Sequence, residues 1–221
     1  MNNITELVFI LDRSGSMSGK EEDVIGGFNS TVSEQREKDQ KTYVTTVLFS
    51  DRSQTIHDRI DISLIPRMER KDFVVGGCTA LIDAIGQAID HIRDVHRYIR
   101  PEDKPDRTLF VIMTDGLENA SSRYDSTTVK RMISAQKESG WEFLFLGANI
   151  DSVETAARFG IDASRAVNYH CDAKGIGASF GGVQKFMNVF FDTEADMEEV
   201  SCALSEGEWR KEADAEYEGR S

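Results

Sequence analysis

Two runs of consecutive apolar residues, each followed at once by a polar turn with an aspartate, constrain the fold of this chain more than any other feature. The first run occupies residues 7–11 and leads into Asp12; the second occupies residues 109–113 and leads through one threonine into Asp115. Such unbroken runs are typical of parallel strands buried on both faces of a sheet. Because ligands of parallel sheets bind beyond the carboxyl ends of the strands, the two aspartates mark the edge where a site is expected.

The rest of the chain alternates between helical and strand patterns. Helical apolar spacing occurs in residues 21–38, 80–99, 127–139, 152–159 and 178–191, and β-branched or aromatic clusters occur in 42–49, 54–60, 141–146 and 166–169. A turn signal at residues 50–53 predicts that the two strands beside it form a hairpin, with 54–60 at the edge. We therefore predict an α/β fold of the Rossmann-like, doubly wound kind, with a mostly parallel six-stranded sheet, one antiparallel edge strand and helices on both faces.

Length and charge suggest how the chain is divided. At 221 residues, with 39% hydrophobic and 29% charged residues, one folded domain is expected, and we assign it to residues 1–192. Residues 193–221 hold ten acidic and three basic residues, which is −7 of the chain's net charge of −13. Because apolar residues are sparse there, we predict an acidic C-terminal tail that is either helical or disordered. The overall acidity argues against nucleic acid or an anionic membrane as a partner, since phosphate binding needs a basic face.

Neither the cysteines nor the N-terminal residues indicate export. Cys78, Cys171 and Cys202 show no CxxC spacing and are odd in number, so neither a disulfide framework nor a zinc cluster is indicated. The apolar run at residues 7–11 is shorter than a signal-peptide core and has no basic residue before it. No stretch approaches the roughly 18 apolar residues that a membrane span needs. A cytoplasmic protein is expected.

Hydroxyl and carboxylate side chains gather in three short motifs. Asp12, Ser14 and Ser16 are spaced i, i+2, i+4 in Asp-Arg-Ser-Gly-Ser; Thr79 stands in Gly-Gly-Cys-Thr-Ala-Leu before the long helix; and Asp115 stands in Met-Thr-Asp-Gly. All five offer hard oxygen donors, which suit Mg²⁺ or Mn²⁺ and suit Zn²⁺ or copper poorly. Each motif alone is typical of a turn or helix cap. Together, each at a predicted strand end or helix start, they indicate a divalent-metal site.

In this order, across residues 5–192, the motifs resemble the von Willebrand factor A family and its metal-ion-dependent adhesion site. The resemblance implies that Ser14, Ser16 and Thr79 coordinate the ion directly, and that Asp12 and Asp115 bind it directly or through water. All five positions of the site are filled. Mg²⁺ is the expected ion, and Mn²⁺ and Ca²⁺ are also compatible. Asp83, one helical turn beyond Thr79, is a candidate to support these ligands.

The resemblance further implies a function in protein interaction. The domain would bind an Asp or Glu carboxylate of a partner protein through the ion, with the loops at residues 50–52, 76–78 and 117–124 selecting the partner. By analogy with the fold, the chain is expected to be an intracellular, single-domain family member of bacterial or phage type that acts as an adaptor or regulator. We expect it not to be an enzyme.

Two other interpretations of these residues stay open at this point. A metal-dependent phosphoester hydrolase is one, because a hydroxyl-rich Mg²⁺ shell can hold phosphate; however, the first strand ends in Asp-Arg-Ser, without a paired carboxylate or a visible general base. A metal that only steadies the loops is the other. A Ser-His-Asp triad is not indicated, since the histidines lie outside the three motifs, and the tripeptide His170-Cys171-Asp172 is interpreted as a surface turn.

Overall fold

The computed structural model describes residues 3–38, 40–192 and 195–220. Within these residues one sheet runs in the strand order β3-β2-β1-β4-β5-β6. Every neighbouring pair is parallel except the β2–β3 hairpin at one edge, which confirms the predicted fold class. The strands are β1 (Ile4–Asp12), β2 (Lys41–Phe49), β3 (Ser53–Asp61), β4 (Arg107–Thr114), β5 (Trp141–Ala148) and β6 (Ala166–Tyr169).

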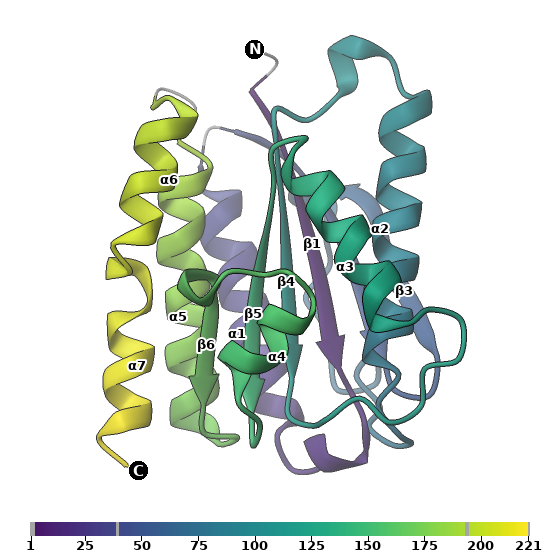
Figure 1. Cartoon of the computed structure of the whole chain (residues 1–221), viewed down its shortest axis with the longest axis vertical. Coiled ribbons are helices and arrows are strands. Elements are labelled where there is room, and N and C mark those ends of the chain that lie inside the picture. The colour runs from purple at the N-terminus through teal and green to yellow at the C-terminus, as the bar shows by residue number, and fades with distance from the viewer. Residues whose placement is uncertain (1–2, 39, 193–194, 221) are drawn as a thin grey trace.

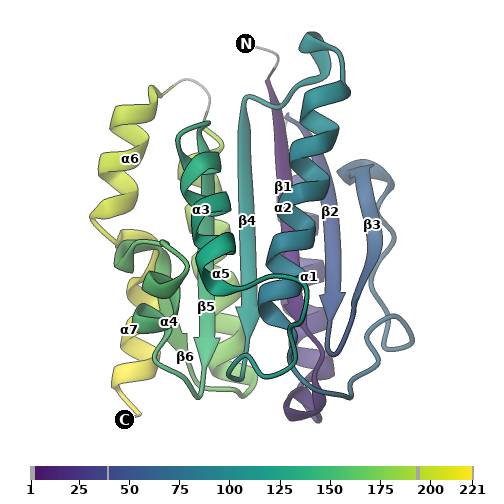
Figure 2. The same cartoon turned by 45° about the vertical axis from the view of Figure 1, so that its right-hand side comes forward.

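Helices cover both faces of this sheet (Figures 1 and 2). The side chains of β1 alternate between the two faces: Leu7 and Phe9 belong to the core under α1 and α5, whereas Val8 and Ile10 belong to the core under α2, α3 and α4. This double burial explains the unbroken apolar run of β1. The helices between strands are α1 (Glu21–Arg36), α2 (Leu81–Tyr98), α3 (Ser126–Lys137) and α4 (Ser152–Arg158), and α5 (Ala173–Phe190) follows β6.

Helix α5 begins at Ala173, well before residue 178, where apolar periodicity placed its start. The carboxylate of Asp172 caps it by accepting the backbone N–H of Lys174 at 3.1 Å and of Gly175 at 3.0 Å. The periodicity missed this first turn because glycine has a low helix propensity. Glycine is required at position 175, since a Cβ there would lie 2.1 Å from the carbonyl oxygen of His170.

The described part of the acidic C-terminal segment, residues 195–220, is helical. Helices α6 (Met197–Ser205) and α7 (Lys211–Glu218) pack along α5, as Figure 1 shows. Four apolar residues of the segment are buried in the core shared with α5, whereas Met197 is exposed; the four are Val200, Leu204, Trp209 and Ala213. The predicted boundary after residue 192 meets residues 193–194, which lie outside the described residues. Among the described residues, each helix is either too short or too polar to serve as a membrane span.

Candidate metal site

Asp12 ends β1 and ties this strand to its neighbour β4. Its Oδ1 accepts the backbone N–H of Ser14 at 2.7 Å, and its Oδ2 accepts the hydroxyl of Thr114, the last residue of β4, at 2.6 Å. The carboxyl group is almost completely buried. Burial raises its pKa above the usual range; the hydrogen bonds from Thr114 and Ser14 act in the opposite direction, and the nearby charge of Asp115 raises the pKa further.

Three of the five predicted ligands form one chain of hydrogen bonds. The hydroxyls of Ser14 and Ser16 lie 3.0 Å apart, and Ser16 Oγ donates to Asp115 Oδ1 at 2.6 Å. This contact joins residues 99 positions apart, because β1 and β4 are adjacent parallel strands whose carboxyl ends meet at the same edge of the sheet. That edge lies at the lower end of Figure 1. Ser14 and Asp115 are buried, whereas Ser16 is exposed, so the site opens to the surface at Ser16.

Backbone hydrogen bonds bring Thr79 to the same edge from a different segment. The N–H of Gly15, between the two serines, donates to the carbonyl of Gly77 at 3.0 Å. Asn119 holds Thr79 from the other side: its side-chain oxygen accepts the Thr79 N–H at 2.9 Å, and its own N–H donates to the Thr79 carbonyl at 3.1 Å. Two other loops therefore hold the segment of Thr79 in place, and its side chain is buried.

A small space between the hydroxyls is bordered by Gly116. A Cβ at this position would lie 3.8 Å from Thr79 Oγ1 and 3.9 Å from Ser16 Oγ. The two hydroxyls thus approach the same point from different segments, and the absence of a side chain on Gly116 leaves room there.

This set of side chains fits a hard divalent cation. It combines two buried carboxylates with three hydroxyls, and these are the oxygen ligands that Mg²⁺ and Mn²⁺ accept. In the described part of the chain, hydroxyl, thiol and N–H groups contact the two carboxylates, and no Lys, Arg or His forms an ion pair with either. A cation would therefore compensate two like charges. Among the described residues, no three or more His, Cys, Asp or Glu side chains form a cluster suited to a metal. Metal binding at the candidate site would therefore need the hydroxyls of Ser14, Ser16 and Thr79 in addition to the two carboxylates.

The structure gives Asp83 a role different from the one expected. Its carboxylate accepts the backbone N–H groups of Ser122, Arg123 and Tyr124, each at 2.9 Å. Burial acts to raise the pKa of Asp83, but the three backbone hydrogen bonds outweigh it and lower the pKa below the usual range. Asp83 therefore anchors the loop after β4 to the start of α2, and among the described residues no hydrogen bond joins its carboxylate to the five predicted ligands.

Cys171 is a residue of this site that sequence analysis did not identify. Its thiol donates to Asp115 Oδ2 across 3.7 Å. Burial, followed by the charge of Asp115, raises the pKa of the thiol to about 12, so the group stays protonated and remains a donor. The available signal was its place two residues after the end of the last strand, β6, whose carboxyl end reaches the same edge of the sheet.

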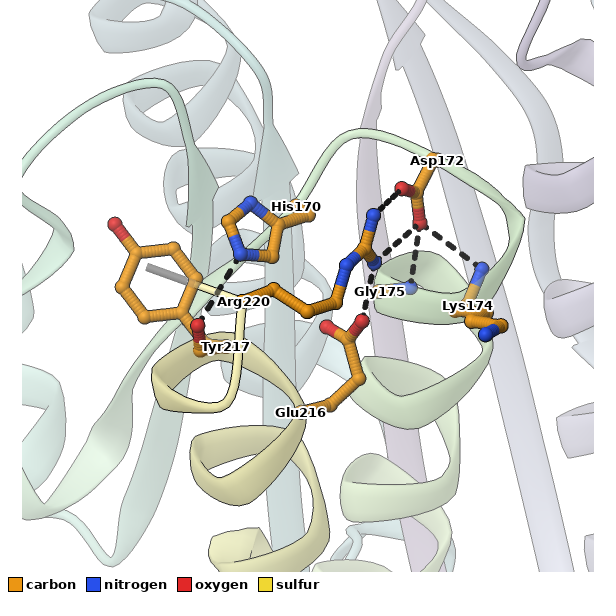
Figure 3. A network of polar contacts seen from close by, with 7 residues as sticks. All are labelled: His170, Asp172, Lys174, Gly175, Glu216, Tyr217 and Arg220. Carbon is orange, nitrogen blue, oxygen red and sulfur yellow. Dashed lines mark hydrogen bonds and ion pairs between the residues drawn. The ribbon is translucent and has the colours of Figure 1, made fainter.

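The residues on either side of this cysteine attach the loop to α7 (Figure 3). The guanidinium of Arg220 pairs with both Asp172 and Glu216. The ring of His170 stacks on Tyr217 with centroids 4.7 Å apart, and its Nε2 lies 3.2 Å from the Tyr217 carbonyl oxygen. The acidic C-terminal segment is thus connected to the loop that contacts the candidate site.

The histidines have their contacts elsewhere. Their side-chain partners are Thr46 for His57, Asp58 for His91, Glu6 for His96 and the Tyr217 carbonyl for His170. Within the described residues, no hydrogen bond joins a histidine to Ser14 or Ser16, so neither hydroxyl has a histidine base.

The chain is an α/β domain with an oxygen-rich candidate site at the carboxyl edge of its sheet. Comparison of the sequence with models of protein families identifies the family of such domains to which it belongs. The model of the von Willebrand factor type A domain matches residues 6–172. Since this match covers well over half of the 221 residues, the chain belongs to the von Willebrand factor type A family. Comparison with curated proteins finds no match.

Solved structures share the fold at low sequence identity. The vWF domain of the type V pili tip protein Mfa5 from Porphyromonas gingivalis has a TM-score of 0.66 and 10% identity, covering 88% of this chain and 98% of that domain. The proximal thread matrix protein 1 of the mussel byssus, with a zinc-occupied MIDAS motif, has a TM-score of 0.53 and 14% identity over 90% of this chain and 46% of that one.

Manganese-loaded TRAP protein of Plasmodium vivax has a TM-score of 0.50 and 19% identity over 66% of this chain and 57% of that one. The match covers less than half of the length of the mussel protein, and a second crystal structure of that protein gives a similar share, 45%. At such identities, the similarity establishes the shared fold.

Proposed function

We propose that this chain is a protein-interaction module that works through a divalent cation. Asp12, Ser14, Ser16, Thr79 and Asp115 hold Mg²⁺ in a complete metal-ion-dependent adhesion site, and an Asp or Glu carboxylate of a partner protein binds to the ion. The module acts in the cytoplasm as an adaptor or regulator and catalyses no reaction. The observation that supports this most is the hydrogen-bonded chain of Ser14, Ser16 and Asp115 across two strand ends.

The five side chains would have different roles in binding the ion. The hydroxyls of Ser14, Ser16 and Thr79 offer neutral oxygens, while Asp12 and Asp115 supply the negative charge. Asp12 also fixes the loop through the Ser14 N–H. When bound, the ion supplies a hard positive charge for a carboxylate oxygen. Because no third carboxylate belongs to the site among the residues that the structure describes, an incoming partner carboxylate is a favourable ligand.

The relatives support this proposal by analogy. The mussel protein is described with a zinc-occupied MIDAS motif, the Plasmodium protein is manganese-loaded, and Mfa5 is a pili tip protein. The donor set of this chain favours Mg²⁺ or Mn²⁺ over Zn²⁺, since all five predicted ligands are oxygens.

Calorimetry on metal-free protein tests the metal part of the proposal. We expect one-to-one binding of Mg²⁺ and Mn²⁺ to the wild type, loss of binding in Ser14→Ala, and unchanged binding in Ser18→Ala, which removes an exposed hydroxyl from the same loop. Equal binding by both variants would refute the assignment of Ser14 as a ligand.

A displayed library of short random peptides tests the partner part. Peptides retained in Mg²⁺ and released by EDTA should be enriched in Asp or Glu, and Ser14→Ala should retain none of them. Retention that ignores EDTA would contradict binding through a metal.

A further inference from the structure

A polar groove starts beside the candidate metal site and runs between α2 and the β2–β3 hairpin. It consists of two hollows, of about 390 and 440 Å³, that share Ser53, Gln87 and Arg123 as lining residues and are therefore continuous. The first hollow is lined by Ala80, the neighbour of the predicted ligand Thr79. The second extends along α2 to His91. The groove thus leads away from the site along one side of the domain.

The floor of the groove is a part of the sheet that α2 leaves uncovered. Figure 2 shows β3 at the sheet edge beyond α2. Thr45, Ser53 and Thr55 line this floor, whereas the same face of the sheet under α2 is apolar. Ser53 Oγ is buried and has no hydrogen-bond partner among the described residues. A buried hydroxyl without a partner costs free energy, so a ligand that supplies one is favoured.

The charges of the groove favour an anionic ligand. Arg52 and Arg123 line it, and in the described part of the chain neither guanidinium forms a hydrogen bond or an ion pair. Asp51, Asp83 and Asp90 also line it, but each of these carboxylates already accepts hydrogen bonds from the chain itself. Among the described residues, the charged groups of the groove that form neither a hydrogen bond nor an ion pair are therefore the two guanidinium groups, on a chain whose net charge is −13. Guanidinium groups bind carboxylates through paired hydrogen bonds.

We propose that this groove is a second anchor for the partner that binds the metal. The occupant is an extended, acidic protein segment: one carboxylate binds at the ion, and a second carboxylate further along pairs with Arg52 and Arg123. This inference rests on the proposed function and adds a specificity rule to it. The metal selects any accessible carboxylate, and the groove selects segments with a second one.

The length of the groove along α2 sets the scale for the spacing of the two acidic residues. From Leu81, at the start of α2, to Gln87, where the two hollows meet, the helix rises by about 9 Å. An extended segment covers that distance in about three residues. The second acidic residue is therefore expected about three positions from the first.

The test compares peptides selected from the displayed random library in Mg²⁺ and released by EDTA. We expect wild-type protein to enrich a second acidic residue about three positions from the first, and the double variant Arg52→Gln, Arg123→Gln to lose only this second preference. A control with the same change in charge is Arg131→Gln, Arg158→Gln, on α3 and α4, which should select as the wild type does.

Affinities of two synthetic peptides complete the test. A two-acid peptide should bind wild-type protein at least tenfold more tightly than its one-acid counterpart, and this advantage should fall below twofold in the groove variant. Equal advantages in both proteins would overturn the groove but leave the metal-dependent function standing. If no peptide is released by EDTA at all, the proposed function fails, and the second anchor fails with it.

Discussion

Replacing Asp12 by asparagine separates the electrostatic cost of the candidate site from its metal binding. Asparagine keeps the shape of the side chain, and its carbonyl oxygen can still accept the Ser14 N–H. It removes the negative charge of a buried carboxylate that lies near a second carboxylate, Asp115. Burial is the main reason why the pKa of the Asp12 carboxyl group is raised. We therefore expect metal-free Asp12→Asn to unfold at a higher temperature than metal-free wild-type protein.

The metal response should change in the opposite way. Binding to the folded state alone, at an ion concentration one hundred times the Kd, stabilises a protein by about 2.7 kcal/mol. For a chain of this length that amounts to an increase in Tm of roughly 5–11 °C. Wild-type protein should show this increase with Mg²⁺ and Mn²⁺, and Asp12→Asn should show almost none.

Thermal unfolding with and without Mg²⁺ measures both effects. The control is Asp151→Asn, which changes an exposed aspartate that caps α4 by accepting the Glu154 N–H at 2.9 Å. Asparagine caps helices about as well as aspartate, so this variant should respond to metal as the wild type does. A full metal response in Asp12→Asn would show that Asp12 is not needed for the ion. A lower Tm of the metal-free variant would show that the charged hydrogen bonds of Asp12 outweigh the cost of its burial.

Three further predictions concern other parts of the molecule. Burial lowers the pKa of His57, so below about pH 6.5 the imidazole binds a proton in the unfolded state but not in the folded state. The free energy of unfolding should therefore fall as the pH drops from about 6.5 toward the lowered pKa, by about 1.4 kcal/mol for each pH unit between the two pKa values. Denaturant unfolding of His57→Gln should show a flatter pH dependence. Trp209→Ala should cost about 3–5 kcal/mol in urea unfolding, because the indole is buried against Phe186, and a cost below about 1 kcal/mol would mean that the C-terminal helices contribute little. Cys171, whose thiol pKa is raised to about 12, should react with iodoacetamide at pH 8 at least tenfold more slowly than the exposed Cys202, as followed by mass spectrometry; equal rates would contradict its protection.

The succession of strands along the chain and the edge of the sheet that carries the candidate site were predictable from local patterns, whereas the order of the strands within the sheet came from the structure. An apolar run without alternation identifies a strand buried on both faces, and β1 and β4 are such strands. A strand end is a property of a few consecutive residues, so the positions of Asp12 and Asp115 at the carboxyl edge followed from the sequence. The contact between Ser16 and Asp115 is a direct consequence of placing these two strands side by side.

Contacts between loops, in contrast, were decided only by the tertiary structure. Asp83 lies one turn beyond Thr79, yet its carboxylate binds the loop at residues 122–124, because backbone N–H groups exposed by that loop compete for it. Cys171 reaches Asp115 from a turn whose composition indicated only surface. A periodic sequence pattern does not show which loops contact each other, since the direction of a loop depends on how the helices and strands that it connects are packed.

The acidic C-terminal segment shows the same division between sequence and structure. Its composition left helix and disorder open, because composition averages over faces. In the folded chain four of its apolar side chains are buried in the core shared with α5, and Arg220 and Tyr217 attach α7 to the loop beside the candidate site. The groove along α2 also exists only in three dimensions, since its walls come from a hairpin, a helix and a loop that are distant in sequence. Local periodicity determines which residues face inward, whereas only the packed structure determines which partners they meet.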